Sequence, residues 1–271
     1  MSDTIKRTLD LSLKKKELLN RLKQQQGLAS VAPVIPLTPV ARKDGELFPL
    51  SFAQQRLWIL EQITPNTPLY NVPLALRLSG SINLAALHFA LCEVVRRHEA
   101  LRTAFGETAG VPFQKSIQVE SLSLPLIDLQ NVHVEQREQA VLRYATEEAE
   151  RPFDLTEGLL LRASLLQLAE CEYVFLMTMH HIASDAWSVE VLYQEILEHY
   201  HAFEAGRPAA LPELTVQYID YALWQRQWLQ EEKLRSPLEY WRQQLQGIEV
   251  LQLPTDRERP AVPSYQGAVV G

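Results

Sequence analysis

Hydrophobic and polar positions alternate in several short stretches of the chain, which is the pattern of strands with one buried face. The clearest stretch is 72–79, where Val72, Leu74, Leu76 and Leu78 alternate with smaller or polar residues. Other short apolar runs also predict strands, and these lie at 101–105, 112–119 and 122–127.

Two longer apolar runs, 159–168 and 172–180, are separated only by a short segment that is typical of a tight turn. Continuous apolar runs of this length are typical of central strands that are buried on both faces. The two runs therefore predict an antiparallel hairpin in the middle of a sheet.

Between these strands the apolar residues recur at helical spacing. Ser51 and Gln54 have the spacing of a capping box, and Asn83 precedes a second helical pattern as an N-cap candidate. Helices are predicted at 51–63, 83–98, 134–150, 188–203, 216–229 and 237–246. The order of elements predicts a mixed α/β domain, with helices packed on a largely antiparallel sheet.

The N-terminal region has a different pattern. Within the segment 1–27, leucines at helical spacing predict a short amphipathic helix, which is either a partner-docking element or a tail. Three prolines in 28–47 preclude a regular helix and indicate a linker. The globular domain, 48–271, is expected to begin near Phe48.

Composition excludes several classes of protein. The net charge is −7 and there is no dense Lys/Arg stripe outside a short N-terminal run, which argues against nucleic acid as the partner. No apolar run approaches the roughly 20 residues that span a bilayer, and the N-terminus lacks the core of a secretory signal. Cys92 and Cys171 have no disulfide or metal-site spacing, so a reducing, cytoplasmic location is expected.

The candidate chemistry lies in "HHIASDAWS", where His180 and His181 end a predicted strand and Asp185 follows. Side chains alternate across a strand, so the two imidazoles cannot face the same side. An imidazole at the rim of a sheet can accept a proton or donate a hydrogen bond to an oxyanion. The Asp185 carboxylate could orient a histidine or pair with an arginine.

The residues alone leave other interpretations open. A metal site lacks a third ligand at standard spacing. The His-x4-Asp spacing of His180 and Asp185 also occurs in glycerolipid acyltransferases. A satisfied pair of core histidines is the structural alternative.

Four stretches together carry a family resemblance, and they lie at 49–62 ("PLSFAQQRLWILEQ"), 96–105 ("RRHEALRTAF"), 177–188 ("MTMHHIASDAWS") and 218–229 ("YIDYALWQRQWL"). In this order they resemble the N-terminal half of a condensation domain of a nonribosomal peptide synthetase, over 48–271. The residues around these motifs resemble the subclass that joins two L-residues. Heterocyclisation relatives replace the histidines with aspartates and do not match.

The resemblance implies a fold like chloramphenicol acetyltransferase, with two similar halves in a V and a tunnel between them. It implies that donor and acceptor carrier domains bring their substrates on phosphopantetheine arms, and that no cofactor or metal is bound directly. The other implied partners are an adjacent adenylation domain and the C-terminal half of the condensation domain. The amine of one substrate attacks the thioester of the other, and an amide forms.

By the same resemblance His181 is the main catalytic residue and His180 supports it. Asp185 and Arg102 match a pair that forms a structural salt bridge. Ser188 is expected to cap the next helix rather than act as a nucleophile, and Trp187 supports the site.

Ala186 stands where the family usually has glycine, so it either strains a positive φ or narrows the passage for the pantetheine arm. Because only one wall of the cleft is present, the chain alone is expected to have little condensation activity. A non-catalytic module that docks carrier domains is the alternative function, and a lipid acyltransferase is remote.

Overall fold

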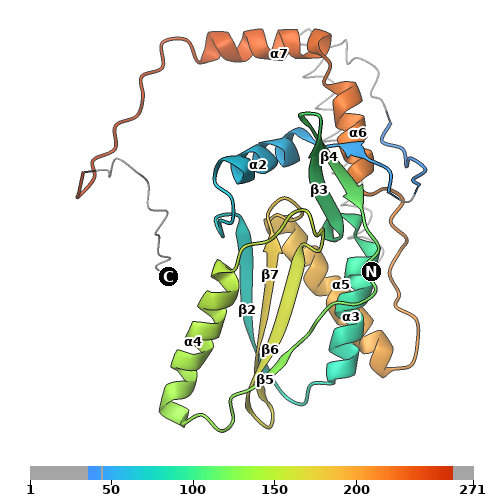
Figure 1. Ribbon diagram of the computed structural model, residues 1–271, viewed down its shortest axis with the longest axis vertical. Coiled ribbons are helices and arrows are strands. Elements are labelled where there is room, and N and C mark those ends of the chain that lie inside the picture. The colour runs from blue at the N-terminus through green and yellow to red at the C-terminus, as the bar shows by residue number, and fades with distance from the viewer. Residues whose placement is uncertain (1–35, 44, 259–271) are drawn as a thin grey trace, which may run out of the picture. The chain divides into compact units, whose positions relative to one another are not determined.

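The computed structural model describes residues 36–43 and 45–258 (Figure 1). The helices are Phe52–Ile63 (α2), Leu84–Arg97 (α3), Val134–Glu150 (α4), Ala186–Glu204 (α5), Tyr218–Trp228 (α6) and Glu231–Gln244 (α7), with a 3-10 turn at Glu99–Leu101 (η1). The strands are Phe48–Pro49 (β1), Asn71–Ser79 (β2), Thr103–Thr108 (β3), Val111–Ser116 (β4), Leu126–Asp128 (β5), Leu161–Ala169 (β6) and Glu172–His180 (β7).

The larger sheet has the strand order β2-β7-β6-β5. β6 and β7 form the predicted antiparallel hairpin, in which Leu161 pairs with Met179. β2 is also antiparallel to β7 and pairs Asn71 with His180, whereas the short β5 runs parallel to β6. The hairpin is therefore central to the sheet, and His180 is the last residue of its inner strand.

Helices cover both faces of this sheet (Figure 1). On one face, the apolar sides of α3 and α5 pack on alternate strand residues such as Leu165 and Met177. On the other face, α4 packs on the intervening residues, among them Leu166 and Leu176. Because both faces are covered, the central strands are continuous apolar runs in the sequence. The fold is the mixed α/β architecture that the pattern predicts.

The helix starts follow their capping residues. The Ser51 hydroxyl accepts from the Gln54 N–H at 3.1 Å, and the Gln54 side chain accepts from the Ser51 N–H, so the capping box is confirmed. The Asn83 side chain accepts from the Ala86 N–H in the same way. The predicted helix 134–150 has the observed bounds of α4.

Several predicted elements have different bounds in the structure, and three of them differ most. The strand predicted at 101–105 begins at Thr103, because the chain first makes a 3-10 turn that ends at Leu101. Of the strand predicted at 122–127, only its last two residues are regular, within β5. The helix predicted from Pro237 begins at Glu231, and the proline lies inside α7.

Of the predicted N-terminal segments, 1–27 lies outside the described residues, and so does the linker up to residue 35. Residues 36–43 have no regular structure. They are nevertheless held to the domain, because the Val40 N–H donates to the Asp220 carboxylate at 2.8 Å and Arg42 pairs with the same carboxylate at 2.9 Å.

Gly158 provides a test of the packing beside β3. Its φ is +82°, and an added Cβ would lie 2.9 Å from both the Cβ and the N of Ala104. Gly206 has a φ of +61° but open space around it. We expect Gly206→Ala to lower the free energy of unfolding by about 1–2 kcal/mol through backbone strain. Gly158→Ala is expected to cost about 1–3 kcal/mol more through overpacking. Urea unfolding of the two variants measures the difference, and equal losses would contradict this packing.

Candidate functional site

The end of β7 places the two histidines in opposite environments. The His180 side chain shares the α4 face of the sheet with Thr178 and is 2 % exposed. His181 lies one residue beyond the strand and is exposed to solvent. The predicted division, with one imidazole inside and one at the rim, is what the structure contains.

His180 is held as a neutral imidazole. Its Nδ1 accepts from the Ile182 N–H at 3.0 Å, so the ring proton resides on Nε2. The edge of the ring packs against Phe153, with 5.9 Å between the centroids. Burial, together with the nearby His181 and Arg162, lowers the pKa of His180 to about 4. A ring that stays neutral and enclosed is suited to shape the loop rather than to exchange protons.

His181 is oriented by its own loop. Its Nδ1 lies 2.5 Å from the Ser184 carbonyl oxygen, so the neutral ring carries its proton on Nδ1 and leaves the Nε2 lone pair available. The loop is closed by two further bonds, because the Ser184 hydroxyl and the Ala183 N–H both donate to the His180 carbonyl. The exposed imidazole therefore has a fixed direction and one unused acceptor.

Asp185 is the N-cap of α5. Its carboxylate accepts from the Ser188 N–H at 2.8 Å and from the Ser188 hydroxyl at 2.7 Å. These bonds lower the pKa of the Asp185 carboxyl. The prediction that Ser188 caps the helix is thus wrong in detail, because Asp185 is the cap and Ser188 is its partner in the capping box.

The predicted Arg102–Asp185 salt bridge is wrong. The Arg102 guanidinium donates to the Arg96 carbonyl, the Ser116 hydroxyl and the Ile117 carbonyl. Arg102 follows the C-terminus of α3, where the free carbonyls attract a cation. Asp185 instead lies at the N-terminus of α5 and bonds to Ser188 there. Arg102 is thus held by the end of α3 together with Ser116 and Ile117, and Asp185 by the first turn of α5.

Ala186 and Trp187, the two residues that follow Asp185, lie at the start of α5. Ala186 is the first residue of α5 and is not among the residues with positive φ, so the alanine adds no left-handed strain. The Trp187 side chain is 82 % exposed. Together with Val191 and Tyr218 it lines a cavity of about 290 Å³ beside the first turn of α5.

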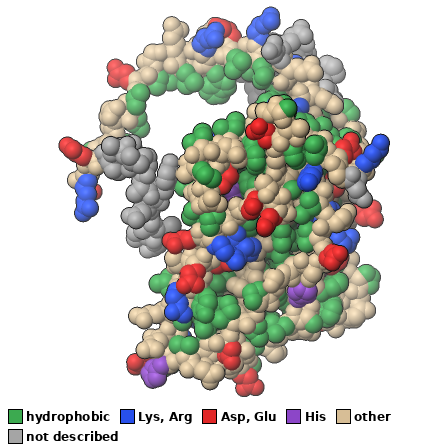
Figure 2. Space-filling model, in the orientation of Figure 1, with side chains coloured by type: hydrophobic (Ala, Val, Ile, Leu, Met, Phe, Trp, Pro, Cys, Tyr) green, Lys and Arg blue, Asp and Glu red, His purple; other side chains and the backbone are tan. Residues whose placement is uncertain are grey.

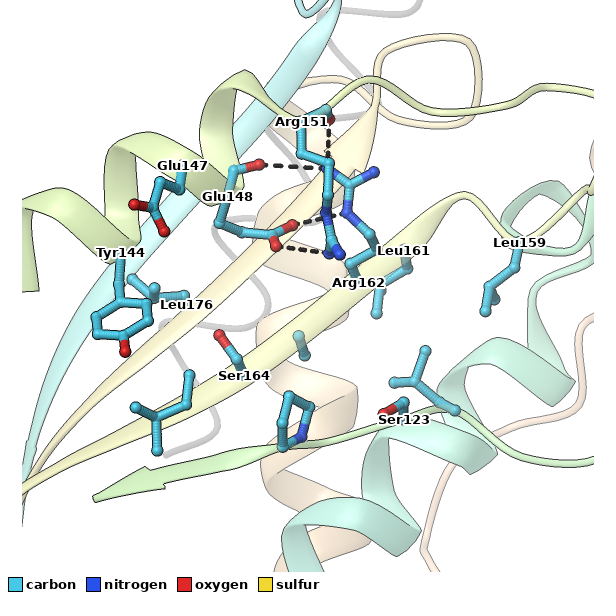
Figure 3. Close-up of a pocket in the computed structure, with 14 residues that line it drawn as sticks. Ser123, Tyr144, Glu147, Glu148, Arg151, Leu159, Leu161, Arg162, Ser164 and Leu176 are labelled. Atoms are coloured by element: carbon cyan, nitrogen blue, oxygen red, sulfur yellow. Dashed lines mark hydrogen bonds and ion pairs between the residues drawn. The ribbon is translucent and has the colours of Figure 1, made fainter. Parts of the chain in front are cut away.

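A half-buried arginine supports His180, and it is absent from the sequence-based predictions. Arg162 donates to the Glu148 carboxylate at 2.7 Å (Figure 3). Its guanidinium carbon lies 3.7 Å from the centroid of the Phe153 ring. Phe153 in turn packs on His180. An isolated arginine inside an apolar strand is a signal for such a partner, since a buried charge must be paired.

Charges elsewhere on the domain are mixed. Figure 2 shows acidic and basic side chains interspersed over the visible face. Arg97 pairs with the buried Glu195 at 3.1 Å. Within residues 36–43 and 45–258 no three His, Cys, Asp or Glu side chains form a metal-sized cluster. In the same part of the chain, no helix is long and apolar enough to cross a membrane.

The fold, together with the loop after β7 that carries His181 and Asp185, is typical of acyltransferase-like domains. Comparison with known proteins identifies the family. The condensation domain model matches residues 45–270. A linear gramicidin synthase protein of Brevibacillus parabrevis is 46% identical over 90% of the chain, but the chain covers only 5% of that protein. The phosphinothricin tripeptide synthetase of Streptomyces viridochromogenes is 40% identical over 99% of the chain and 24% of its own length.

Solved structures agree with the family match. The X-domain from teicoplanin biosynthesis, solved in complex with OxyB, has a TM-score of 0.74 and 33% identity, covering 87% of this chain and 51% of that one. The starter condensation domain of rhizomide synthetase shares the fold, with a TM-score of 0.67 at 22% identity. The chain belongs to the condensation domain family of nonribosomal peptide synthetases, and it spans about half the length of the solved domains it matches.

The buried His180 makes stability depend on pH. Its pKa is about 4 in the folded protein and 6.5 when unfolded, so the unfolded state binds more protons between these values. We expect the free energy of unfolding to fall by about 3 kcal/mol from pH 6.5 to pH 4 through this group. Urea unfolding across this range measures the loss.

His180→Asn is expected to remove this part of the pH dependence, and His133→Gln, on an exposed ring in front of α4, serves as the control. An NMR titration of the wild-type His180 ring provides a test that does not need the variant to fold. A His180 pKa near 6.5 would contradict the buried, neutral imidazole.

Proposed function

We propose that this chain supplies the histidine-bearing half of a condensation domain that forms an amide bond in nonribosomal peptide synthesis. The acceptor is an aminoacyl amine on one carrier domain, and the donor is an acyl or peptidyl thioester on another. The observation that carries the proposal is the exposed His181 ring, with Nδ1 bonded to its own loop and Nε2 left available for a substrate.

The reaction requires little from the protein beyond this available imidazole nitrogen. An amine attacks a thioester without strong activation, so holding the two ends together supplies much of the acceleration. In the attack, the amine nitrogen bonds to the thioester carbonyl carbon and the sulfur leaves as a thiol. The His181 Nε2 accepts the proton that the amine loses or, once protonated, donates to the oxyanion.

The remaining motif residues hold that ring in place. The Asp185 cap fixes where α5 begins, and the Ser184 carbonyl fixes the tautomer of His181. His180, neutral and enclosed, anchors the loop from below. None of these roles requires a serine or cysteine nucleophile. The subclass that joins two L-residues stays part of the proposal on the sequence resemblance alone.

Replacement of His181 tests the proposal in the complete synthetase. We expect His181→Ala to lower the rate of amide formation from two loaded carriers by about 10²–10⁴-fold, the usual contribution of a general acid or base. His133→Ala, the same change on an exposed histidine in front of α4, is the matched control and keeps most of the rate. Normal product from His181→Ala would favour the alternative, a module that only docks carrier domains.

The isolated chain is expected to give little or no amide. A tunnel between two halves needs both walls to hold the two thioesters together, and loss of that proximity removes most of the acceleration. Mass spectrometry of the loaded carriers, with and without the 271-residue chain, measures this. Robust turnover by the chain alone would contradict the requirement for a second half.

A further inference from the structure

A wedge-shaped cavity opens between β6 and the segment that leads into β5 (Figure 3). Its volume is about 440 Å³, which lies within the range of about 300–1,000 Å³ for ligand pockets. Apolar side chains form most of its walls, with Tyr144 and Glu148 of α4 at one side. The cavity exists because β5 begins to pair with β6 only at Leu165, so the preceding stretch of β6 has no strand beside it within the described residues.

The backbone of Ala163 faces this opening. The Leu165 N–H donates to the Pro125 carbonyl across the sheet at 2.9 Å. Alternate residues of a strand direct their backbone groups to the same side, so the N–H and C=O of Ala163 point the same way. Pro125 has no N–H to offer the Ala163 carbonyl, and within the described residues no backbone bond joins Ala163 to Ser123. The edge of the sheet is therefore open at one hydrogen-bonding residue.

Ser164 adds a polar group to the same space. The residue is only 8 % exposed, and its hydroxyl has no hydrogen-bond partner among the described residues. Figure 3 shows the hydroxyl directed into the cavity from β6. A hydrogen bond from this hydroxyl to a bound ligand would tighten binding by about two- to tenfold, the usual net effect of such a bond.

The charges around the cavity argue for a neutral ligand. Arg162 donates to the Glu148 carboxylate and to the carbonyls of Glu148, Arg151 and Pro152, so four of its five N–H donors are already used and its charge is paired. The Arg151 guanidinium also pairs with Glu148, at 2.6 Å. Glu147 adds a negative charge at the rim. An anionic ligand would find no unpaired cation among these lining residues, whereas an amide chain with apolar side chains matches the walls.

We propose that this wedge binds the extended backbone of a neutral peptide, with Ala163 supplying an N–H and a C=O and Ser164 supplying a hydroxyl. Addition of a strand to an open sheet edge gives affinity through the main chain and specificity through side-chain pockets. The peptide would be the growing donor chain of the condensation reaction; that identification rests on the proposed function, whereas the binding does not.

The position of the wedge suits a donor chain. Arg162, at its rim, pairs with Thr178 of β7, two residues before His180. The neighbouring Leu160 carbonyl accepts from the His180 N–H at 3.2 Å. The wedge thus runs along the strand adjacent to β7, from Ser164 toward the end that carries the histidines.

A titration of the ¹⁵N-labelled chain with acetyl-leucyl-leucine N-methylamide tests the binding. The Ala163 amide is expected to shift and to gain protection from hydrogen exchange. The same peptide with its internal amides N-methylated should bind about tenfold more weakly, the equivalent of about 1.4 kcal/mol for one lost hydrogen bond. Equal affinity for the two peptides, no binding, or shifts confined to the cavity at Trp187 would overturn the proposal.

Two variants extend the test. Ser164→Ala should weaken binding about fivefold through the lost hydroxyl. Ser164→Phe fills the cavity and should abolish binding, and Ser81→Phe places the same ring at an exposed site as the control. Thermal melts report whether Ser164→Phe folds; if it does not, the Ser164→Ala and N-methylated measurements decide. Unchanged affinity in Ser164→Ala would contradict the role of the hydroxyl.

The outcome is separable from the proposed function. Peptide binding combined with normal product from His181→Ala would retain the site and remove the condensation role. Loss of product in His181→Ala without peptide binding would overturn the wedge alone. The titration is repeated on the complete domain, and a peptide that binds only the isolated chain would overturn the donor role, because a segment of the second half would then occupy the wedge.

Discussion

The site depends on one geometric constraint, that consecutive residues of a strand cannot face the same side. β7 ends at His180, and its α4 face is buried, so that ring is enclosed and kept neutral. The next residue, His181, must then emerge at the rim of the sheet. The packing that stabilises the strand therefore also determines which imidazole can meet a substrate. A register shift of one residue would exchange the two rings and bury His181.

The loop after β7 keeps this arrangement with few contacts. The His180 carbonyl accepts two hydrogen bonds from within the loop, the Ser184 carbonyl holds His181, and the Asp185 carboxylate begins α5. All of these bonds join residues within a few positions of one another. The motif is therefore held largely by its own hydrogen bonds, and the more distant support comes from Phe153 and the half-buried Arg162.

Local signals in the sequence predicted much of this structure. The capping residues Ser51 and Asn83, the apolar hairpin and the opposite faces of the two histidines all follow from patterns between near neighbours in the chain. The side-chain partners of residues in distant segments did not follow from such local patterns. The family resemblance assigned Arg102 to Asp185, and local patterns do not show that the Arg102 guanidinium instead bonds to the end of α3 and to Ser116 and Ile117. Arg162 was overlooked for the same reason, since Glu148 lies on a separate helix.

The open edge of β6 also bears on how such a domain obtains its rate. If attack on a thioester needs mainly proximity, then affinity for the two substrates matters more than the strength of the base. His181 offers one acceptor and no extended surface, so the binding energy must come from elsewhere. The edge of β6 offers main-chain groups that any peptide can match, whatever its side chains. Such a site would hold a growing chain of changing sequence, and it would leave discrimination to the walls around it.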